Sequence, residues 1–338
     1  MSTVNGKPAK EVIRPWQINL LCSLIVLNVL LYFNLFFTPG FMLLEFKHGH
    51  LYGSLVDILK LSSRVMLVSL GMTLVIATAG VDLSVGAIMA IAGSVAAKLL
   101  TQDHAGLSAA IVATLGVCFL LGAWNGALVA RFGVQPIVAT LILMVAGRGI
   151  AQLLTDGQII TVENPEFTFI AGGHFLGLPV PFVIVLTALV LTAALTRWTA
   201  MGLFIESVGN NEAASRFAGV NARAVKLFVY TFCGLCAGVA GLIEASTIKA
   251  ADANNAGLYL ELDAIMAVVI GGTSLAGGRF NLPGSLAGAL IIQTLTTTIL
   301  TRGVPVEYTL VVKAVVVLAV CLLQSERFRG LVSRRRNS

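Results

Sequence analysis

The chain has 338 residues, of which 57% are hydrophobic and only 11% are charged, with a formal net charge of +6. A soluble domain carries roughly 25% charged residues, so this chain could not hide its apolar surface by folding in water. The basic residues are scattered over short flanks and loops instead of forming one continuous patch. This distribution is typical of membrane topology and argues against nucleic acid as a partner.

Hydrophobic runs of membrane-spanning length recur from Trp16 to Gln324. A helix needs about 20 mostly apolar residues to cross the hydrocarbon core, and continuous runs favour helices over a barrel. We predict an all-α polytopic membrane protein in which residues 1–338 form a single transmembrane domain of about ten helices. In chain order the predicted spans are Trp16–Phe37, Leu55–Ala79, Leu83–Leu100, Leu107–Ala130, Pro136–Leu154, Val180–Thr196, Leu227–Ser246, Leu262–Leu275, Gly284–Leu300 and Val306–Leu323.

The charges on either side of these spans predict the topology. An even number of spans puts both termini on one side, and basic residues mark the cytosolic side. The segments on the predicted inner side carry Lys7, Lys10, Arg14, Arg131, Arg197, Arg216, Arg223, Lys226, Arg279, Arg327, Arg329, Arg334, Arg335 and Arg336. The opposite loops carry Glu45, Asp103, Asp156, Glu163, Glu166, Asp252 and Glu261. We therefore expect both termini in the cytosol and the terminal arginines against membrane lipid.

Two glycine-containing breaks interrupt the hydrophobic runs, at Ile76–Ala87 (IATAGVDLSVGA) and Val269–Gly284 (VIGGTSLAGGRFNLPG). Broken segments in both halves of a transporter indicate a substrate path at the interface of the halves. Asp82 stands before a predicted helix, so capping that helix is its expected main role. For Asn125 and Gln293, contact with substrate hydroxyls and packing inside the bundle are equally good interpretations. The predicted path residues are Gly80, Asp82, Gly86, Asn125, Gly271, Gly272 and Gln293.

Four charged residues lie inside or at the ends of predicted spans: Arg148, Glu244, Asp263 and Lys313. Charges in a membrane are costly and usually face the bundle interior or an interface. Glu244 and Lys313 have opposite signs, so they form a candidate ion pair.

The chain offers no arrangement that predicts catalysis or metal binding. Its four histidines fall in predicted outer loops, without the thiols or paired carboxylates that a metal site needs. It has no phosphate-binding loop of the GxxxxGK[ST] type. We therefore expect no enzyme activity and no cofactor in this chain, and any ATP and Mg²⁺ would be used by a partner subunit.

The most specific signal is a polar segment between two spans, residues 200–226. Its centre reads NNEAASRFAGVN, from Asn210 to Asn221. Alanines favour a helix, an asparagine caps its start and a glycine ends it. We predict a short cytosolic coupling helix that a partner subunit binds, with the alanines against the partner and the charged residues at the rim. The predicted coupling residues are Asn210, Asn211, Glu212, Ala213, Ala214, Arg216 and Gly219.

Three stretches, Gly71–Gly93, Val208–Asn221 and Leu260–Asn281, resemble the membrane permeases of sugar-importing ABC transporters of the ribose/galactose/arabinose type. Within that group, Gln135–Leu153 and Ala251–Ile265 are most similar to galactofuranose-type permeases. The segment from Glu212 to Gly219 is also similar to the EAA loop of importers, although its glycine comes one residue later.

The resemblance implies the ten-span fold of the vitamin-B12 importer (type II) and a location in the bacterial inner membrane. It implies three kinds of protein partner: a cytosolic ABC ATPase, a periplasmic sugar-binding protein and a second permease, either a related chain or another copy. The implied function is to form the path for a monosaccharide, galactofuranose being the best candidate.

A secondary transporter coupled to ions or protons is the alternative. Such a protein would need its own coupling site, for which Asp82, Glu244 and Asp263 are the candidates. A membrane-embedded enzyme is disfavoured because no nucleophile–base pair or metal set is apparent.

Overall fold

The computed structural model describes residues 15–38, 40–47, 50–305 and 308–324. The two basic tails, from Lys7 to Arg14 and from Arg327 to Arg336, lie outside the described residues, as do both termini.

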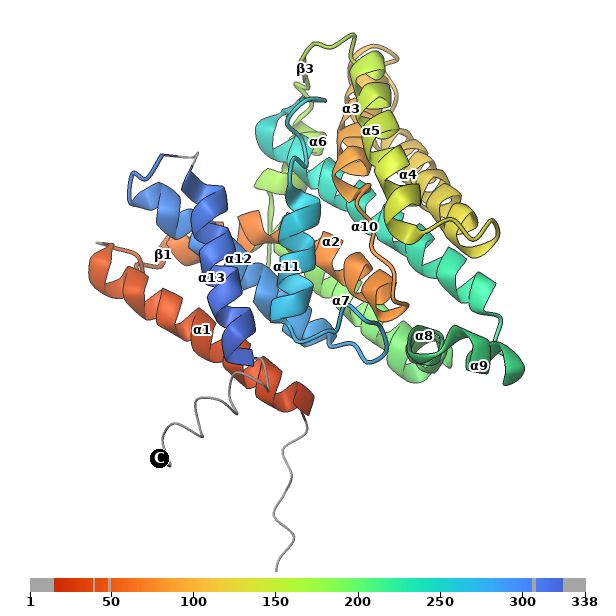
Figure 1. Ribbon diagram of the computed structural model, residues 1–338. Helices are drawn as coiled ribbons and strands as arrows, with labels where there is room; N and C mark the ends of the chain where they lie inside the picture. Colours follow the sequence, from red (N-terminus) through yellow and green to blue (C-terminus); the bar gives the residue numbers. More distant parts are fainter. Residues whose placement is uncertain (1–14, 39, 48–49, 306–307, 325–338) are drawn as a thin grey trace, which may run out of the picture.

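The described chain is mostly helical (Figure 1), as predicted. Ten of its helices coincide with the ten predicted spans, with ends that differ by a few residues. These are α1 (Pro15–Phe37), α2 (Ser54–Ala77), α3 (Val85–Thr101), α4 (Leu107–Ala130), α5 (Pro136–Leu154), α7 (Val180–Trp198), α10 (Ala222–Ile248), α11 (Leu260–Ile270), α12 (Leu282–Thr301) and α13 (Thr309–Gln324). Three shorter helices lie between them: α6 (Pro165–Gly172), α8 (Met201–Asn210) and α9 (Glu212–Phe217).

Seven of the described helices are long and apolar enough to cross a membrane alone, namely α1, α2, α4, α5, α7, α10 and α12. Helices α3 and α13 are apolar but shorter. Helix α11 has 11 residues, which is about 17 Å of helix against roughly 30 Å of hydrocarbon. It ends at Ile270 because Gly272 takes a positive φ of 88° and turns the chain. The predicted span Leu262–Leu275 is therefore wrong at its C-terminal end.

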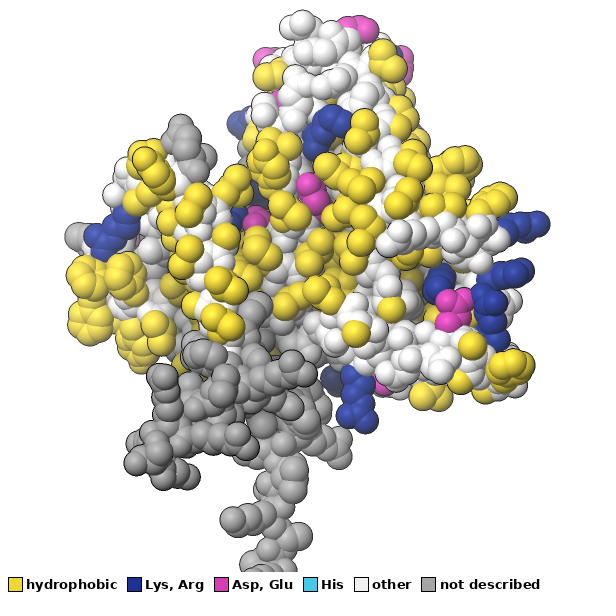
Figure 2. All heavy atoms as spheres, in the orientation of Figure 1, with side chains coloured by type: hydrophobic (Ala, Val, Ile, Leu, Met, Phe, Trp, Pro, Cys, Tyr) yellow, Lys and Arg dark blue, Asp and Glu magenta, His cyan; other side chains and the backbone are white. Residues whose placement is uncertain are grey.

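The spanning helices form a buried centre and an exposed periphery. In an apolar 18-residue stretch of each helix, 78% of the residues of α2 and 67% of those of α10 and α12 are buried. The corresponding share is only 11–28% for α1, α4, α5 and α7. Hydrophobic side chains cover much of the visible surface (Figure 2). Because water would disfavour that surface, these outer helices suit contact with lipid or with another apolar protein surface.

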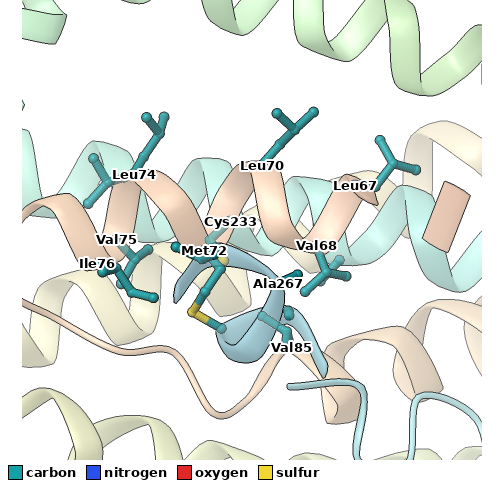
Figure 3. Close-up of a cluster of buried hydrophobic side chains, with 14 of the residues drawn as sticks. Leu67, Val68, Leu70, Met72, Leu74, Val75, Ile76, Val85, Cys233 and Ala267 are labelled. Carbon is teal, nitrogen blue, oxygen red and sulfur yellow. The ribbon is translucent and has the colours of Figure 1, made fainter. Parts of the chain in front are cut away.

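The centre is a continuous apolar core around α2. Leu70, Met72, Leu74 and Ile76 are fully buried there (Figure 3). Helix α10 crosses close to α4 because both carry glycine at the crossing. A Cβ added to Gly234 would stand 2.7 Å from the carbonyl oxygen of Cys118 on α4. This distance is too short for any side chain at position 234. Small residues of this kind let membrane helices pack backbone to backbone.

Three two-stranded antiparallel pairs tie the connections between helices. β1 (Glu45–Lys47) pairs with β2 (His50–Tyr52), β3 (Ile160–Thr161) with β6 (Ala250–Ala251), and β4 (His174–Phe175) with β5 (Leu178–Pro179). The β3–β6 pair joins the α5–α6 connection to the end of α10.

The predicted ion pair of Glu244 with Lys313 is wrong. Glu244 on α10 pairs instead with Arg64 on α2, and Lys313 on α13 pairs with Asp263 on α11 at 2.8 Å. Each of these four side chains is less than one-fifth exposed. The pairs join helices that are far apart in sequence, so their partners are decided by helix packing.

Candidate functional site

The coupling segment forms two short helices, α8 and α9, as a protrusion at one edge of the bundle (Figure 1). The side chain of Asn211 accepts a hydrogen bond from the backbone N–H of Ala214 at 2.9 Å, which is the predicted N-cap. Asn210 instead ends α8. Gly219 has a φ of 86° and follows the end of α9, as predicted for a helix stop.

Glu212 fastens α9 to the start of α10. Its carboxylate pairs with Arg216 at 2.5 Å on its own helix and with Lys226 at 2.6 Å on α10. The hydrogen bond from Lys226 lowers the pKa of the Glu212 carboxyl, so that group is ionised at neutral pH. The sequence predicts that Glu212 lies at the rim of the interface with a partner, yet its carboxylate forms ion pairs with residues of this chain. Lys226 is the residue that sequence analysis missed.

The outward face of α9 is formed by Ala213, Ala214 and Phe217, all exposed, whereas Ser215 is buried. Phe217 is 94% exposed, the highest value among the large hydrophobic side chains of the described chain. It is not among the predicted coupling residues. The signal is present in the sequence, because Phe217 follows Ala213 by four residues and therefore shares its helix face.

The end of α8 packs backbone to backbone against both glycine-containing breaks. A Cβ added to Gly209 would stand 1.8 Å from the carbonyl oxygen of Ala77 and 2.6 Å from the amide nitrogen of Gly278. That carbonyl accepts a hydrogen bond from the Gly278 N–H at 2.9 Å. The coupling segment, the break after α2 and the break after α11 therefore meet at one point, which we call the three-way junction.

Two of the predicted path residues are brought together in a buried network at the first break. Asp82 Oδ1 accepts hydrogen bonds from the Ser84 backbone N–H at 3.0 Å and from Ser84 Oγ at 2.6 Å. Asn125 on α4 donates its side-chain N–H to Ser84 Oγ at 2.8 Å. Asp82 and Asn125 are fully buried. Asp82 does not cap α3 as predicted: the N-cap is Ser84, no side-chain hydrogen bond caps the helix, and Asp82 binds Ser84 itself.

The predicted glycines serve close packing. A Cβ on Gly80 would stand 2.5 Å from the Tyr230 hydroxyl, one on Gly86 2.4 Å from the Gly257 carbonyl oxygen, and one on Gly271 2.4 Å from the Gly284 carbonyl carbon. Gly272 supplies the turn after α11. Gln293 on α12 is half-buried and donates to Thr297 at 3.4 Å. Their part in a substrate path stays a prediction.

Arg148 fastens α5 to the loop that precedes α11. Its guanidinium donates to the carbonyl oxygens of Ala253 at 3.0 Å and Ala256 at 2.7 Å. Glu261, predicted in an outer loop, is instead buried in the first turn of α11, with its Oε2 2.7 Å from where a Gly86 Cβ would be. These residues organise the region between α3, α5 and α11.

The Asp82 network leads to a prediction about charge. Asp82→Asn keeps an acceptor for Ser84 and removes a charge from a buried site, so we expect membrane abundance and uptake close to wild type. Asp82→Ala leaves the Ser84 donors unpaired and should cost about 1–3 kcal/mol of stability. Abundance, thermal unfolding and uptake of both variants check this. An Asn variant as damaged as the Ala variant would mean that the negative charge itself is required, as in an ion-coupled transporter.

A bundle of apolar helices with the short capped helix α9 on a polar connection has the features of a membrane permease component. The family model of the branched-chain amino acid transport system permease component matches residues 54–321. The chain belongs to this family.

Three relatives are similar over most of their length. The galactofuranose transporter permease protein YtfT of Escherichia coli (strain K12) is 52% identical over 310 residues, which cover 92% of this chain and 91% of the relative. The fructose import permease protein FruF of Bifidobacterium longum is 40% identical, covering 93% and 89%. The ribose import permease protein RbsC of Escherichia coli (strain K12) is 38% identical, covering 90% and 93%. No solved structure matches the chain.

Proposed function

We propose that this chain is the permease subunit of an ATP-driven sugar importer and forms the path for a monosaccharide. The observation that carries the proposal is the short, capped helix α9, which holds its small residues and Phe217 outward. The relatives named for sugar import favour a sugar, and the 52% identity to a galactofuranose transporter permease favours galactofuranose.

The proposal includes the partners and the setting. A cytosolic ABC ATPase, which uses ATP and Mg²⁺, would grip α9, and a periplasmic sugar-binding protein would deliver the substrate. A second permease, related or identical, would complete the path in the bacterial inner membrane, within a type II importer fold. Both termini would be cytosolic. Ser2→Cys and Ser338→Cys test this topology in cells whose inner membrane is intact. Labelling of either cysteine by a membrane-impermeant reagent added outside would contradict it.

Uptake in reconstituted vesicles tests the function. The permease is reconstituted with the ATPase and binding protein encoded with it, and uptake of radiolabelled galactofuranose, ribose and fructose is compared. We expect uptake of one sugar that requires ATP and the binding protein. Uptake that follows an imposed proton or sodium gradient without ATP would favour the secondary transporter.

Helix α9 gives a prediction about coupling. Ala213→Trp places a large side chain on the outward face, which should hold the partner surfaces apart and abolish uptake and sugar-stimulated ATP hydrolysis. The Ala213 side chain is exposed, so insertion into the membrane should be unchanged. Permease abundance, ATPase co-purification and uptake are measured in the same cells. Normal uptake with Trp at position 213 would show that α9 is a plain connector.

A further inference from the structure

The surface around α9 combines one exposed aromatic side chain with a group of cations. Arg131, Arg216, Arg223 and Lys226 line one hollow of about 340 Å³ between the end of α4, α9 and the start of α10. Basic side chains gather beside α9 at this edge of the molecule (Figure 2). We call Arg131, Arg216 and Arg223, which are exposed, the basic collar.

The basic collar has an excess of positive charge that the described part of this chain does not neutralise. Glu212 is the single carboxylate among the described residues that line the hollow, and it is already paired with Arg216 and Lys226. Within the described residues, no carboxylate lies within ion-pairing distance of Arg131 or Arg223. The lining therefore has a formal charge of +3, from four cations and one anion. A surface of this kind selects a partner of complementary, negative potential.

Phe217 stands next to this collar and is nearly fully exposed. Burying a phenylalanine side chain gains about 1.5–3 kcal/mol, and aromatic anchors dominate many interfaces. The helix that carries Phe217 is fixed by the Asn211 cap and by the Glu212 ion pairs, so little conformational entropy is lost when a partner binds.

A lipid surface fits these observations less well than a protein. Helices that lie in a membrane interface bury an extended apolar face, several turns long, and turn a strongly polar face to water. Helix α9 has only six residues, and Glu212 and Arg216 take up two of them. Its apolar surface is one aromatic ring beside two alanines, a small protruding surface that suits insertion into a pocket on a protein.

This inference rests on the proposed function. We propose that the ATPase surface that receives α9 contains an apolar socket for the Phe217 ring, bordered by carboxylates that face Arg131 and Arg223. The aromatic ring would supply affinity, and the charges would supply orientation and speed of association.

The test uses the full-length permease and the ATPase encoded with it, in detergent micelles without anionic lipid, with Kd measured at low and high salt. We expect Phe217→Ala to weaken binding about 30-fold, as for an aromatic anchor, and Phe217→Leu to restore most of the affinity. The double variant Arg131→Gln/Arg223→Gln lowers the formal charge of the lining from +3 to +1, so it should weaken binding at low salt and reduce its salt dependence.

Two control variants are matched in chemistry and lie elsewhere. Leu176→Ala removes an apolar side chain that is 89% exposed in the β4–β5 turn, and Lys249→Glu reverses an exposed cation at the far end of α10. Neither should change Kd. The socket proposal would be overturned if Phe217→Ala left Kd unchanged, or if the control variants weakened binding by the same factor. The same affinities are also measured with the permease in vesicles that contain anionic lipid. If Phe217→Ala weakens ATPase binding only in those vesicles, the exposed face of α9 binds lipid and the socket proposal is overturned.

The socket and the proposed function can fail separately. A wild type that takes up sugar without ATP would defeat the proposed function. A wild type that is ATP-driven, together with a Phe217→Ala variant that binds the ATPase and transports as well as wild type, would defeat the socket alone.

Discussion

Gly209→Ala is expected to reduce sugar uptake strongly, because the new methyl group would overlap backbone atoms at the three-way junction. Its Cβ would stand 1.8 Å from the Ala77 carbonyl oxygen and 2.6 Å from the Gly278 amide nitrogen. Backbone cannot yield as a flexible side chain can, so α8 must move away or the hydrogen bond between Gly278 and Ala77 must break. Overpacking of this kind costs about 1–3 kcal/mol. We expect uptake per permease to fall at least about tenfold.

The effect should be specific to coupling. Movement of α9 would reach both glycine-containing breaks through this junction, so a displaced α8 should separate ATP hydrolysis from transport. Gly149→Ala on α5 is the matched control, since no atom lies within 4 Å of its added Cβ. Uptake, ATPase activity and abundance are measured for both variants. Wild-type uptake by the Gly209 variant would mean that the junction is not rigid and does not transmit motion.

Breaking the pair between Arg64 and Glu244 should produce the second large effect. The two side chains are 19% and 16% exposed, and they join α2 to α10 across the centre of the bundle. Glu244→Gln leaves the Arg64 guanidinium without its counter-ion where water reaches it poorly. Removing one partner of a fully buried pair costs about 3–5 kcal/mol, and partial exposure should reduce that to about 2–3 kcal/mol.

The double variant Arg64→Met/Glu244→Met separates stability from function. Apolar replacement of a buried pair is often neutral or stabilising, so the double variant should unfold at a higher temperature than Glu244→Gln. Thermal unfolding and uptake of the single and double variants complete the cycle. A double variant that is as unstable as the sum of its single changes would show that the two residues do not act as a pair. A stable double variant without uptake would assign the pair to transport.

Local chemistry made much of this molecule predictable from sequence. The positions of ten helices follow from apolar runs, since only a helix satisfies the backbone of a lipid-exposed segment. The start and stop of α9 follow from Asn211 and Gly219, whose effects act within a few residues. The predicted capping of α3 by Asp82 is wrong in detail, because its side chain accepts from Ser84, the residue that precedes the helix.

The partners of charged residues could not be predicted, because they depend on which helices pack together. Arg64 and Glu244 are 180 residues apart, and Glu244 pairs with Arg64 where opposite sign alone suggests Lys313. The same holds for the three-way junction, in which Gly209 touches Ala77 and Gly278. Phe217 has the right spacing to share the face of Ala213, yet its 94% exposure is a property of the folded chain.

The sequence by itself determined that this is a helical membrane protein with a polar helix set between two spans, because hydrophobicity, capping and helix stops act locally. Only the tertiary structure decided which side chains of that helix are exposed to a partner and which segments of the bundle the helix region contacts. Close backbone packing places Gly209 against both breaks, the pairing of Glu212 with Lys226 joins α9 to α10, and Phe217 is left exposed. Those features arise from contacts between segments distant in sequence, whose energies exist only once the bundle has formed.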